Sequence, residues 1–479
     1  MLLNFKVKQI EYRIIIIFII GFCIRLLPLF FSPLGRDAYD YIKGAESILK
    51  GKYDTDRPPI FPLLILMFLL VTQNSILAAR LASFTTGNLL IITLYLVFKK
   101  ASLEIFANDK NGLKKSKNIG LLISFLISIH FEFVINSGIG LYEELISILY
   151  VLFFYFLYIV KEKDSFKNYL ILGLLIICLT LIHVSIGVFL FISITFFFLF
   201  SKLRYFKINL IEKIRISNKK YFFIIFVIVF SYLSWLIFCA FNFGDPFYTI
   251  NRQKGWFKSN VEINLDSPQG ILFAIINGLY FGLLNELVIL LYSIGIIFTF
   301  SIVLMFLNHN KNEQILFILF IIIFNFLYIS IFLTVPNLYK IILDIILNQN
   351  FTNYAIPSPR LIIYFFPFLI YVGSIFIVKN LYWFYENKPY ISISAIKLKI
   401  KISNFLLLFL CFYTIRHLIL INSIINLIYV PYDNILDYVL LFCQGLFLFP
   451  LVLLPFLWKI KNKIKNKIKK ESKKDNNNN

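Results

Sequence analysis

The chain has 479 residues, of which 59% are hydrophobic and only 15% are charged. Its mean hydropathy is +0.82, and it contains 56 phenylalanines. A soluble chain has roughly 45–50% apolar and about 25% charged residues, so a set of water-soluble domains is excluded. The composition predicts an all-α integral membrane protein. It also makes nucleic-acid binding a poor explanation of the formal net charge of +22.

Twelve apolar stretches are candidates to cross a bilayer, which takes about 20 residues in a helix. They lie at 14–33, 76–98, 118–136, 145–160, 169–182, 184–200, 221–241, 284–307, 315–335, 361–378, 404–422 and 438–457. We read the first as uncleaved because no small-residue cleavage site follows it. The expected count is 11 to 13, since only His183 separates the two short stretches around 169–200. Twelve spans place both termini on the same side.

Basic residues gather on the side of the N-terminus. The seven segments expected there hold 34 of the 47 Lys and Arg residues but only 10 of the 25 acidic ones. These segments are 1–13, 99–117, 161–168, 201–220, 308–314, 379–403 and 458–479. Because Lys and Arg are retained in cytoplasmic loops, both termini are expected to be cytoplasmic and the other face external.

The expected organisation has three parts. Residues 1–380 form a transmembrane module whose long external segments, at 34–75, 242–283 and 336–360, are where any reaction would take place. Residues 381–457 add further spanning helices, and 458–479 form a basic cytoplasmic tail. The tail is either a surface helix on anionic lipid or a solvated segment that enforces topology. The five cysteines form no CxxC pair, so a thiolate zinc site is excluded.

The first external segment carries the strongest local signals. Residues 38–49 have apolar positions at helical spacing, which predicts an amphipathic helix at the interface. Asp37 stands at the start of that helix, where a carboxylate is either an N-cap or a functional group. After Arg57-Pro-Pro, about ten apolar residues follow, too few to cross, so a re-entrant or interfacial helix is expected.

This first external segment resembles the first external loop of the GT-C glycosyltransferases. The likeness is closest to the clan of dolichyl-phosphate-mannose–protein mannosyltransferases and lipid A aminoarabinose transferases. The resemblance covers roughly residues 10–375. The motifs that carry it occur in the family's order: Arg25 late in the first span; Asp37, Tyr41, Ala45, Gly51 and Arg57-Pro-Pro; Ala78-Ala-Arg-Leu81; Leu141-Tyr-Glu-Glu-Leu145; Ser234-Trp235 with Asn242–Pro246; and Pro359-Arg360 with Pro367.

The resemblance implies a single displacement from a polyprenyl-phosphate-linked sugar to a hydroxyl acceptor on the external face. A carboxylate would take the proton of the alcohol, and basic groups would hold the lipid phosphate. Asp37 is the expected base and Arg57, Arg360 and His183 are the expected phosphate contacts. Many relatives have two adjacent acids at the first motif, whereas Asp37 is followed by Ala38, so the choice between Asp37 and Asp40 stays open. His183 stands where a basic residue is often expected.

Further acidic and polar residues are secondary candidates. Glu143 and Glu144 open the expected fourth span, where they either orient a substrate or complement the helix dipole. His130 and Glu132 lie near the outer end of the third span, and an ionisable pair at membrane depth is a candidate functional site. A mutual hydrogen bond is favoured there over a metal site. No cofactor is predicted with certainty, and a divalent metal is possible.

Two other functions remain open: a multi-pass transporter or flippase of lipid-linked glycans, and a non-catalytic membrane scaffold. The absence of an internal repeat and of Gly- or Pro-broken helices in matching halves counts against the transporter. The presence of Asp37 counts against the scaffold. The sequence names neither the sugar, hexosyl or pentosyl, nor the acceptor, which is a protein, a glycolipid or a surface glycan. It also leaves the oligomeric state open.

Overall fold

A computed structural model of the chain describes residues 11–183 except 36, 56 and 164, together with 217–249, 366–387, 390–393, 398–401 and 403–425. A few single residues between 186 and 195 and between 440 and 444 are also described. Several predictions lie outside the described residues: the spans 284–307 and 315–335, most of 184–200 and of 438–457, the tail 458–479 and Arg360.

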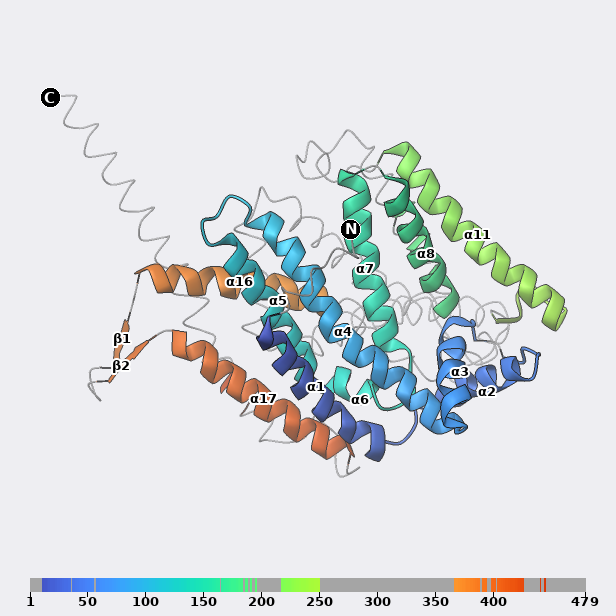
Figure 1. Ribbon diagram of the computed structural model, residues 1–479, viewed down its shortest axis with the longest axis horizontal. Helices are drawn as coiled ribbons and strands as arrows, with labels where there is room; N and C mark the ends of the chain where they lie inside the picture. The colour runs from blue at the N-terminus through green and yellow to red at the C-terminus, as the bar shows by residue number, and fades with distance from the viewer. Residues whose placement is uncertain are drawn as a thin grey trace, which may run out of the picture.

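Three helices pack against one another in the first part of the chain (Figure 1): α1 (Tyr12–Phe31), α4 (Ser75–Ile105) and α5 (Gly112–Ile129). A second set continues this group, because α7 (Glu143–Glu162) contacts α4, α8 (Phe166–Ile182) contacts α7, and α11 (Asn218–Phe243) contacts α8. Within the described residues, four helices are long and apolar enough to cross a membrane: α1, α4, α7 and α11. The expected all-α membrane fold is therefore confirmed.

Two short helices lie at one end of this row. They are α2 (Ala38–Leu49) and α3 (Ile60–Thr72), and they contact each other and the first half of the long α4. Gln73 adopts the left-handed conformation that ends α3, and the Asn74 side chain accepts a hydrogen bond from the Leu77 amide at the start of α4. The structure thus confirms the amphipathic helix and the short apolar helix predicted for the first external segment.

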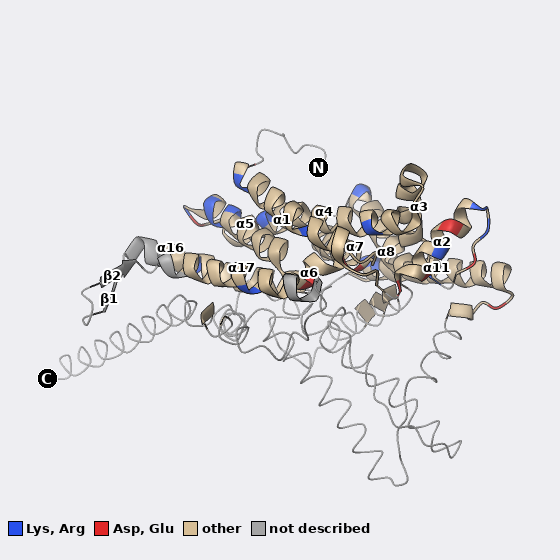
Figure 2. Ribbon diagram, turned by 90° about the horizontal axis from the view of Figure 1, so that it is seen from below, with Lys and Arg blue, Asp and Glu red and all other residues tan. Residues whose placement is uncertain are grey.

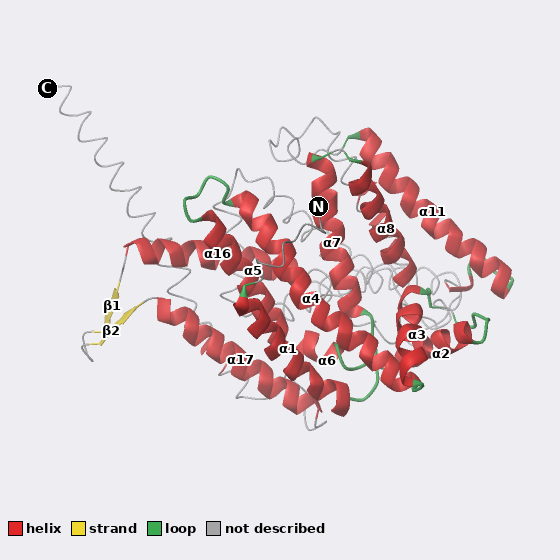
Figure 3. Cartoon of the chain, in the orientation of Figure 1, coloured by secondary structure: helices red, strands yellow, loops and turns green. Residues whose placement is uncertain are grey.

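The described C-terminal part consists of two helices and a hairpin. Helix α16 (Phe366–Asn387) packs on α5, and α17 (Ser403–Ile425) contacts a short helix, α6 (Phe131–Asn136). Between α16 and α17, strands β1 (Tyr390–Ile393) and β2 (Leu398–Lys401) pair antiparallel, with Tyr390 opposite Lys401 (Figure 3). This hairpin is the exception to an otherwise helical fold in the described residues.

The single span expected at 118–136 is wrong, because the helix breaks at His130. Helix α5 ends at Ile129, His130 has an extended backbone (φ −65°, ψ 125°), and α6 starts at Phe131. A break within a span exposes backbone groups that have no water to bind, so other groups must satisfy them. The Phe131 amide donates to His417 Nδ1 at 3.3 Å, which supplies a partner at the new helix start.

The turn between α6 and α7 lies directly against the backbone of α1. A Cβ at Gly138 would lie 2.4 Å from the carbonyl carbon of Pro28, so only glycine fits there. The same turn accepts a hydrogen bond at Ile139 from the Gly35 amide, at 2.8 Å. These contacts fix the start of α7 relative to the segment that carries Asp37.

Candidate functional site at the start of α2

Helix α2 orients the acidic residues of the first external segment. Its buried face includes Ala38, Tyr41, Ile42 and Ala45, which accounts for the helical spacing seen in the sequence. Asp37 stands at the N-cap position, but its side chain makes no capping hydrogen bond and its backbone is already helical (φ −73°, ψ −16°). The explanation of Asp37 as a simple helix cap is therefore wrong.

Arg57 joins the two candidate bases in one cluster. Its Nη2 donates to Asp37 Oδ1 at 3.3 Å and to Asp40 Oδ2 at 3.0 Å, and its Nε donates to the same Asp40 oxygen at 3.3 Å. The side chains of Asp37 and Asp40 are 43% and 38% exposed, whereas that of Arg57 is 21% exposed. The cluster of two carboxylates and one guanidinium carries a formal charge of −1 and is open to solvent on its acidic side.

The loop that carries Arg57 is held by two hydroxyl groups. The Tyr53 hydroxyl donates to the Arg57 carbonyl, and Thr55 Oγ1 accepts from the Arg57 amide at 3.3 Å while donating to the Asp40 carbonyl at 3.4 Å. The Tyr53 ring also packs edge-on against Trp235 and Phe238 near the end of α11. This loop is therefore attached to α2 on one side and to α11 on the other. Figure 2 shows acidic and basic segments together at α2.

An aromatic surface lies beneath the guanidinium. Arg57 stands 5.4 Å from the centre of the Tyr41 ring, in the geometry of a cation–π contact. Tyr41 packs edge-on against Phe61 of α3 and against Tyr142, which precedes α7. Burial raises the pKa of Tyr41 and Tyr142 above the ordinary value, so both hydroxyls keep their proton at neutral pH.

His183 belongs to the same neighbourhood. It follows α8, and its ring centre lies 5.8 Å from that of Tyr142. Burial, together with the nearby positive charge of Arg57, lowers the pKa of His183 to about 4, while Asp37 opposes the shift. His183 is therefore neutral at pH 7. It would reach a phosphate through a ring N–H rather than through a positive charge.

Glu143 and Glu144 open α7 as predicted, and both are almost fully buried. Glu143 contributes to the electrostatic environment of Tyr41 and Tyr142, which places it beside the Arg57 cluster. Glu144 interacts electrostatically with Arg25 instead. No hydrogen bond to either carboxylate oxygen of Glu144 is found among the described residues.

The other ionisable residues fall into a different part of the molecule. The His130 ring lies 4.6 Å from that of His417 of α17 and 4.7 Å from that of Phe366 of α16, between centres. His130 is buried and Glu132 is half-buried. The part of the chain that the structure describes contains no group of three or more His, Cys, Asp or Glu residues that could hold a metal. A divalent metal stays a prediction, and Arg360 lies outside the described residues.

Sequence reasoning missed the structural role of two arginines. Arg25 is fully buried and donates to the carbonyls of Ser128, at 2.7 Å, and Ile127, at 3.3 Å, in the last turn of α5. Arg80 donates to the carbonyls of Leu29 and Ser32 at the end of α1. Each guanidinium thus satisfies carbonyls that a helix end leaves without partners. The signal in the sequence was an arginine inside, or at the edge of, an apolar span.

No family model and no curated protein matches the sequence. The structure is similar to the crystal structure of ArnT from Cupriavidus metallidurans bound to undecaprenyl phosphate. The TM-score is 0.50 and the identity 11%, over 91% of this chain and 76% of that one. The chain therefore shares the overall fold of that ArnT structure.

The same protein in the apo state matches with a TM-score of 0.46 and 10% identity, over 91% of this chain and 75% of that one. At such low identity the likeness to ArnT concerns the fold. The fold class and the GT-C resemblance read from the sequence are confirmed at that level.

Proposed function

We propose that the chain is a membrane glycosyltransferase that transfers a sugar from a polyprenyl-phosphate-linked donor to a hydroxyl group. The cluster of Asp37, Asp40 and Arg57 is the observation that carries this proposal. It combines exposed carboxylates with a guanidinium, the two kinds of group that this reaction needs. The GT-C-type fold supports it, since the similar ArnT structure is bound to undecaprenyl phosphate.

The proposed reaction is a single displacement at the anomeric carbon. The acceptor oxygen forms a bond to that carbon as the bond to the phosphate oxygen breaks, and the carboxylate takes the proton of the acceptor hydroxyl. The polyprenyl phosphate leaves with the bonding electrons, so its growing negative charge needs a cation. Arg57 Nε and Nη2 already contact the acids, whereas no hydrogen bond from Nη1 is found among the described residues. That group is the proposed phosphate contact.

Asp37 is the better proposed base of the two acids. Two nitrogens of Arg57 donate to Asp40 Oδ2, and the side chain of Asp37 is slightly more exposed than that of Asp40. A general base must come within hydrogen-bond reach of the acceptor hydroxyl, which the more exposed carboxylate does more easily. Asp40 would then be a positioning residue that fixes the guanidinium. His183, Glu143 and Arg360 are proposed to contact the donor, the first through its neutral ring.

The proposed orientation places this cluster on the external face and both termini in the cytoplasm. It rests on the excess of Lys and Arg in the segments expected to face the N-terminal side. A donor lipid in the outer leaflet would then meet the cluster from the membrane, because α2 and α3 are too short to cross and lie at this end of α4.

The test is sugar transfer in membranes that contain the full chain, with radiolabelled polyprenyl-phosphate hexoses and pentoses as donors. Asp37→Asn is expected to lower the rate by about 10²- to 10⁴-fold, the usual contribution of a general base. Asp54→Asn is the matched control, because Asp54 is an exposed acid of the same segment that pairs with Lys43 instead. Its rate is expected to match the unmodified chain.

Asp40→Asn separates the two acids. If Asp40 positions Arg57, its loss weakens donor binding and raises KM more than it lowers kcat. A loss of kcat in Asp40→Asn with normal turnover in Asp37→Asn would reverse the assignment. Transbilayer movement of the lipid-linked sugar without any transfer would instead favour a flippase.

A further inference from the structure

A second candidate site lies at the opposite end of the helices that frame the acidic cluster. The cluster is near the start of α4 and α7 and the end of α8, whereas a cavity of about 210 Å³ opens near the end of α4 and α7 and the start of α8. At 1.5 Å per residue, the 20 residues of α7 put about 30 Å between the two ends. That distance matches the hydrocarbon thickness of a bilayer.

The interior of this cavity is apolar. Helix α4 contributes residues such as Leu96 and Val97, α7 contributes Leu152 and Phe156, and α8 contributes Ile171. Helix α7 contacts both α4 and α8, so the cavity follows its surface between the two neighbours. An apolar groove between spanning helices offers a hydrocarbon chain the same environment as the bilayer interior.

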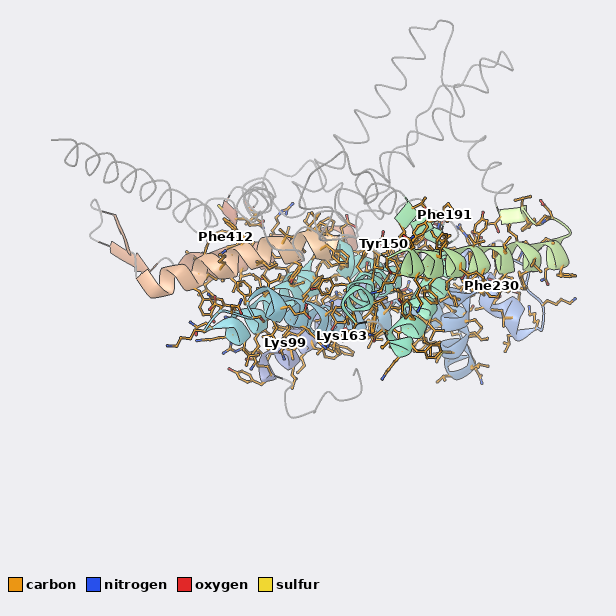
Figure 4. The ribbon with its side chains drawn as sticks, turned by 90° about the horizontal axis from the view of Figure 1, so that it is seen from above. Lys99, Tyr150, Lys163, Phe191, Phe230 and Phe412 are labelled. Atoms are coloured by element: carbon orange, nitrogen blue, oxygen red, sulfur yellow. The ribbon has the colours of Figure 1, made fainter. Side chains whose placement is uncertain are left out.

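The mouth of the cavity is positively charged. Lys100 from α4, Lys163 after α7 and Lys167 from α8 all line it. Lys100 is half-buried, and the other two are exposed. No acidic residue is found among the described residues that line the cavity, and none of the ion pairs of the described residues involves these three lysines. Figure 4 shows Lys163 and Lys99, the neighbour of Lys100, on the same side of the molecule.

We propose that this cavity binds an anionic glycerophospholipid of the leaflet opposite the acidic cluster. One acyl chain lies in the groove between α4, α7 and α8, and the phosphate contacts Lys100, Lys163 and Lys167. Charge complementarity decides the occupant, because three cations that form no ion pair with a described residue lie at the mouth of an apolar groove and match a phosphate attached to a hydrocarbon chain. This site is independent of sugar transfer, since its lysines lie at the opposite ends of α4, α7 and α8 from the acidic cluster.

The test uses the purified full chain in a neutral detergent. Binding of dioleoyl phosphatidylglycerol and dioleoyl phosphatidylcholine is measured by titration with native mass spectrometry. The two lipids have the same chains and differ in head-group charge. We expect phosphatidylglycerol to bind at least about tenfold more tightly, and its affinity to fall about fivefold for each lysine changed to Gln among Lys100, Lys163 and Lys167.

The matched control removes the same number of charges at the predicted cytoplasmic face. Lys110→Gln, Lys114→Gln and Lys117→Gln together change three lysines near the start of α5 that do not line this cavity. This triple variant is expected to keep the affinity of the unmodified chain within about twofold. The comparison variant changes Lys100, Lys163 and Lys167 together to Gln. If its affinity for phosphatidylglycerol falls no more than that of the control, the lipid is attracted by surface charge without a site, and the proposal is overturned.

Two further measurements test the groove itself. Thr93→Trp places a large ring in the cavity and leaves the lysines in place, so phosphatidylglycerol binding should fall at least about tenfold. If its lipid-free unfolding temperature drops, Ile171→Trp replaces it. Free glycerol phosphate at millimolar concentration should not displace the lipid. Full displacement, or unchanged binding in a folded Trp variant, would overturn the proposal.

Discussion

At the scale of single residues, charged side chains in this protein act mainly on one another and on helix ends. Arg57 illustrates the first case, because it contacts both Asp37 and Asp40. Arg25 and Arg80 illustrate the second, since each donates to carbonyls at the end of a helix. The sequence alone shows where these five charged residues lie along the chain, but it does not show which groups each of them contacts.

His183 gives a prediction about pH. Because its pKa is lowered to about 4 in the folded chain and is near 6.5 when unfolded, the unfolded chain binds the proton first as the pH falls. Stability is therefore expected to drop between about pH 6.5 and pH 4, by up to about 1.4 kcal/mol per pH unit. Unfolding temperatures measured across this range should show the drop, and His183→Gln should reduce it.

The control for this measurement is His309→Gln, because the sequence places His309 in a loop expected to face the cytoplasm. Its acid sensitivity should match that of the unmodified chain. An equal loss of stability for the unmodified chain and His183→Gln would show that another group titrates.

Arg25 gives a second prediction at this scale. Arg25→Met removes the donor to Ile127 and Ser128 and leaves Glu144 buried without its cation. We expect a loss of about 3–5 kcal/mol in the free energy of unfolding. Adding Glu144→Gln should restore part of that loss, and a double-mutant cycle should give a coupling of about 0.5–3 kcal/mol. Strictly additive effects would contradict the coupling. Arg13→Met, at an exposed position, is the control.

At the scale of elements, hydrophobic patterning predicted most helices well. The amphipathic α2 and the short α3 follow from the spacing of apolar residues and from the length of the apolar run. The break at His130 could not be predicted, because the residues on both sides are apolar and the groups that stabilise the break come from elsewhere. These groups are His417 in α17 and Arg25 in α1.

The turn between α6 and α7 gives a prediction for one glycine. Gly138→Ala would bring a methyl group to 2.4 Å from the backbone of Pro28, where neither chain can move easily. The turn and α1 must then separate, which we expect to lower stability by at least about 1–3 kcal/mol, as overpacking does. Thermal unfolding of the purified chain measures this. Gly173→Ala is the control, since its nearest atom lies at 3.5 Å. Equal stability of the two variants would contradict the close approach.

At the scale of the whole molecule, composition predicted an integral membrane protein and the structure confirms it. The predicted orientation in the membrane rests on the excess of Lys and Arg in the segments of the N-terminal side, and labelling can test it. With the five native cysteines replaced by Ser, a cysteine at Lys52 should react with a membrane-impermeant maleimide in intact cells. A cysteine at Lys114 should react only after permeabilisation, since both positions are exposed but lie on opposite predicted faces. The reverse pattern would invert the orientation.

For the candidate site, the sequence predicts which types of residue take part but not how they are arranged. The residue types were predictable, because transfer to an alcohol from a lipid phosphate needs carboxylates and cations. Their arrangement was not, because it depends on the loop that returns Arg57 to Asp37 and on the hydroxyls of Tyr53 and Thr55. Arg57 was expected to hold a phosphate, and the structure adds its ion pairs with both acids.

Tyr53 has a consequence for how distant parts of the chain communicate. Its ring rests on Trp235 and Phe238, while its hydroxyl holds the backbone of Arg57. The side chain of Tyr53 therefore links the C-terminal part of α11 to the backbone that carries the Arg57 guanidinium. A displacement of that helix end would therefore pass through Tyr53 to the backbone of Arg57, the residue that pairs with both aspartates.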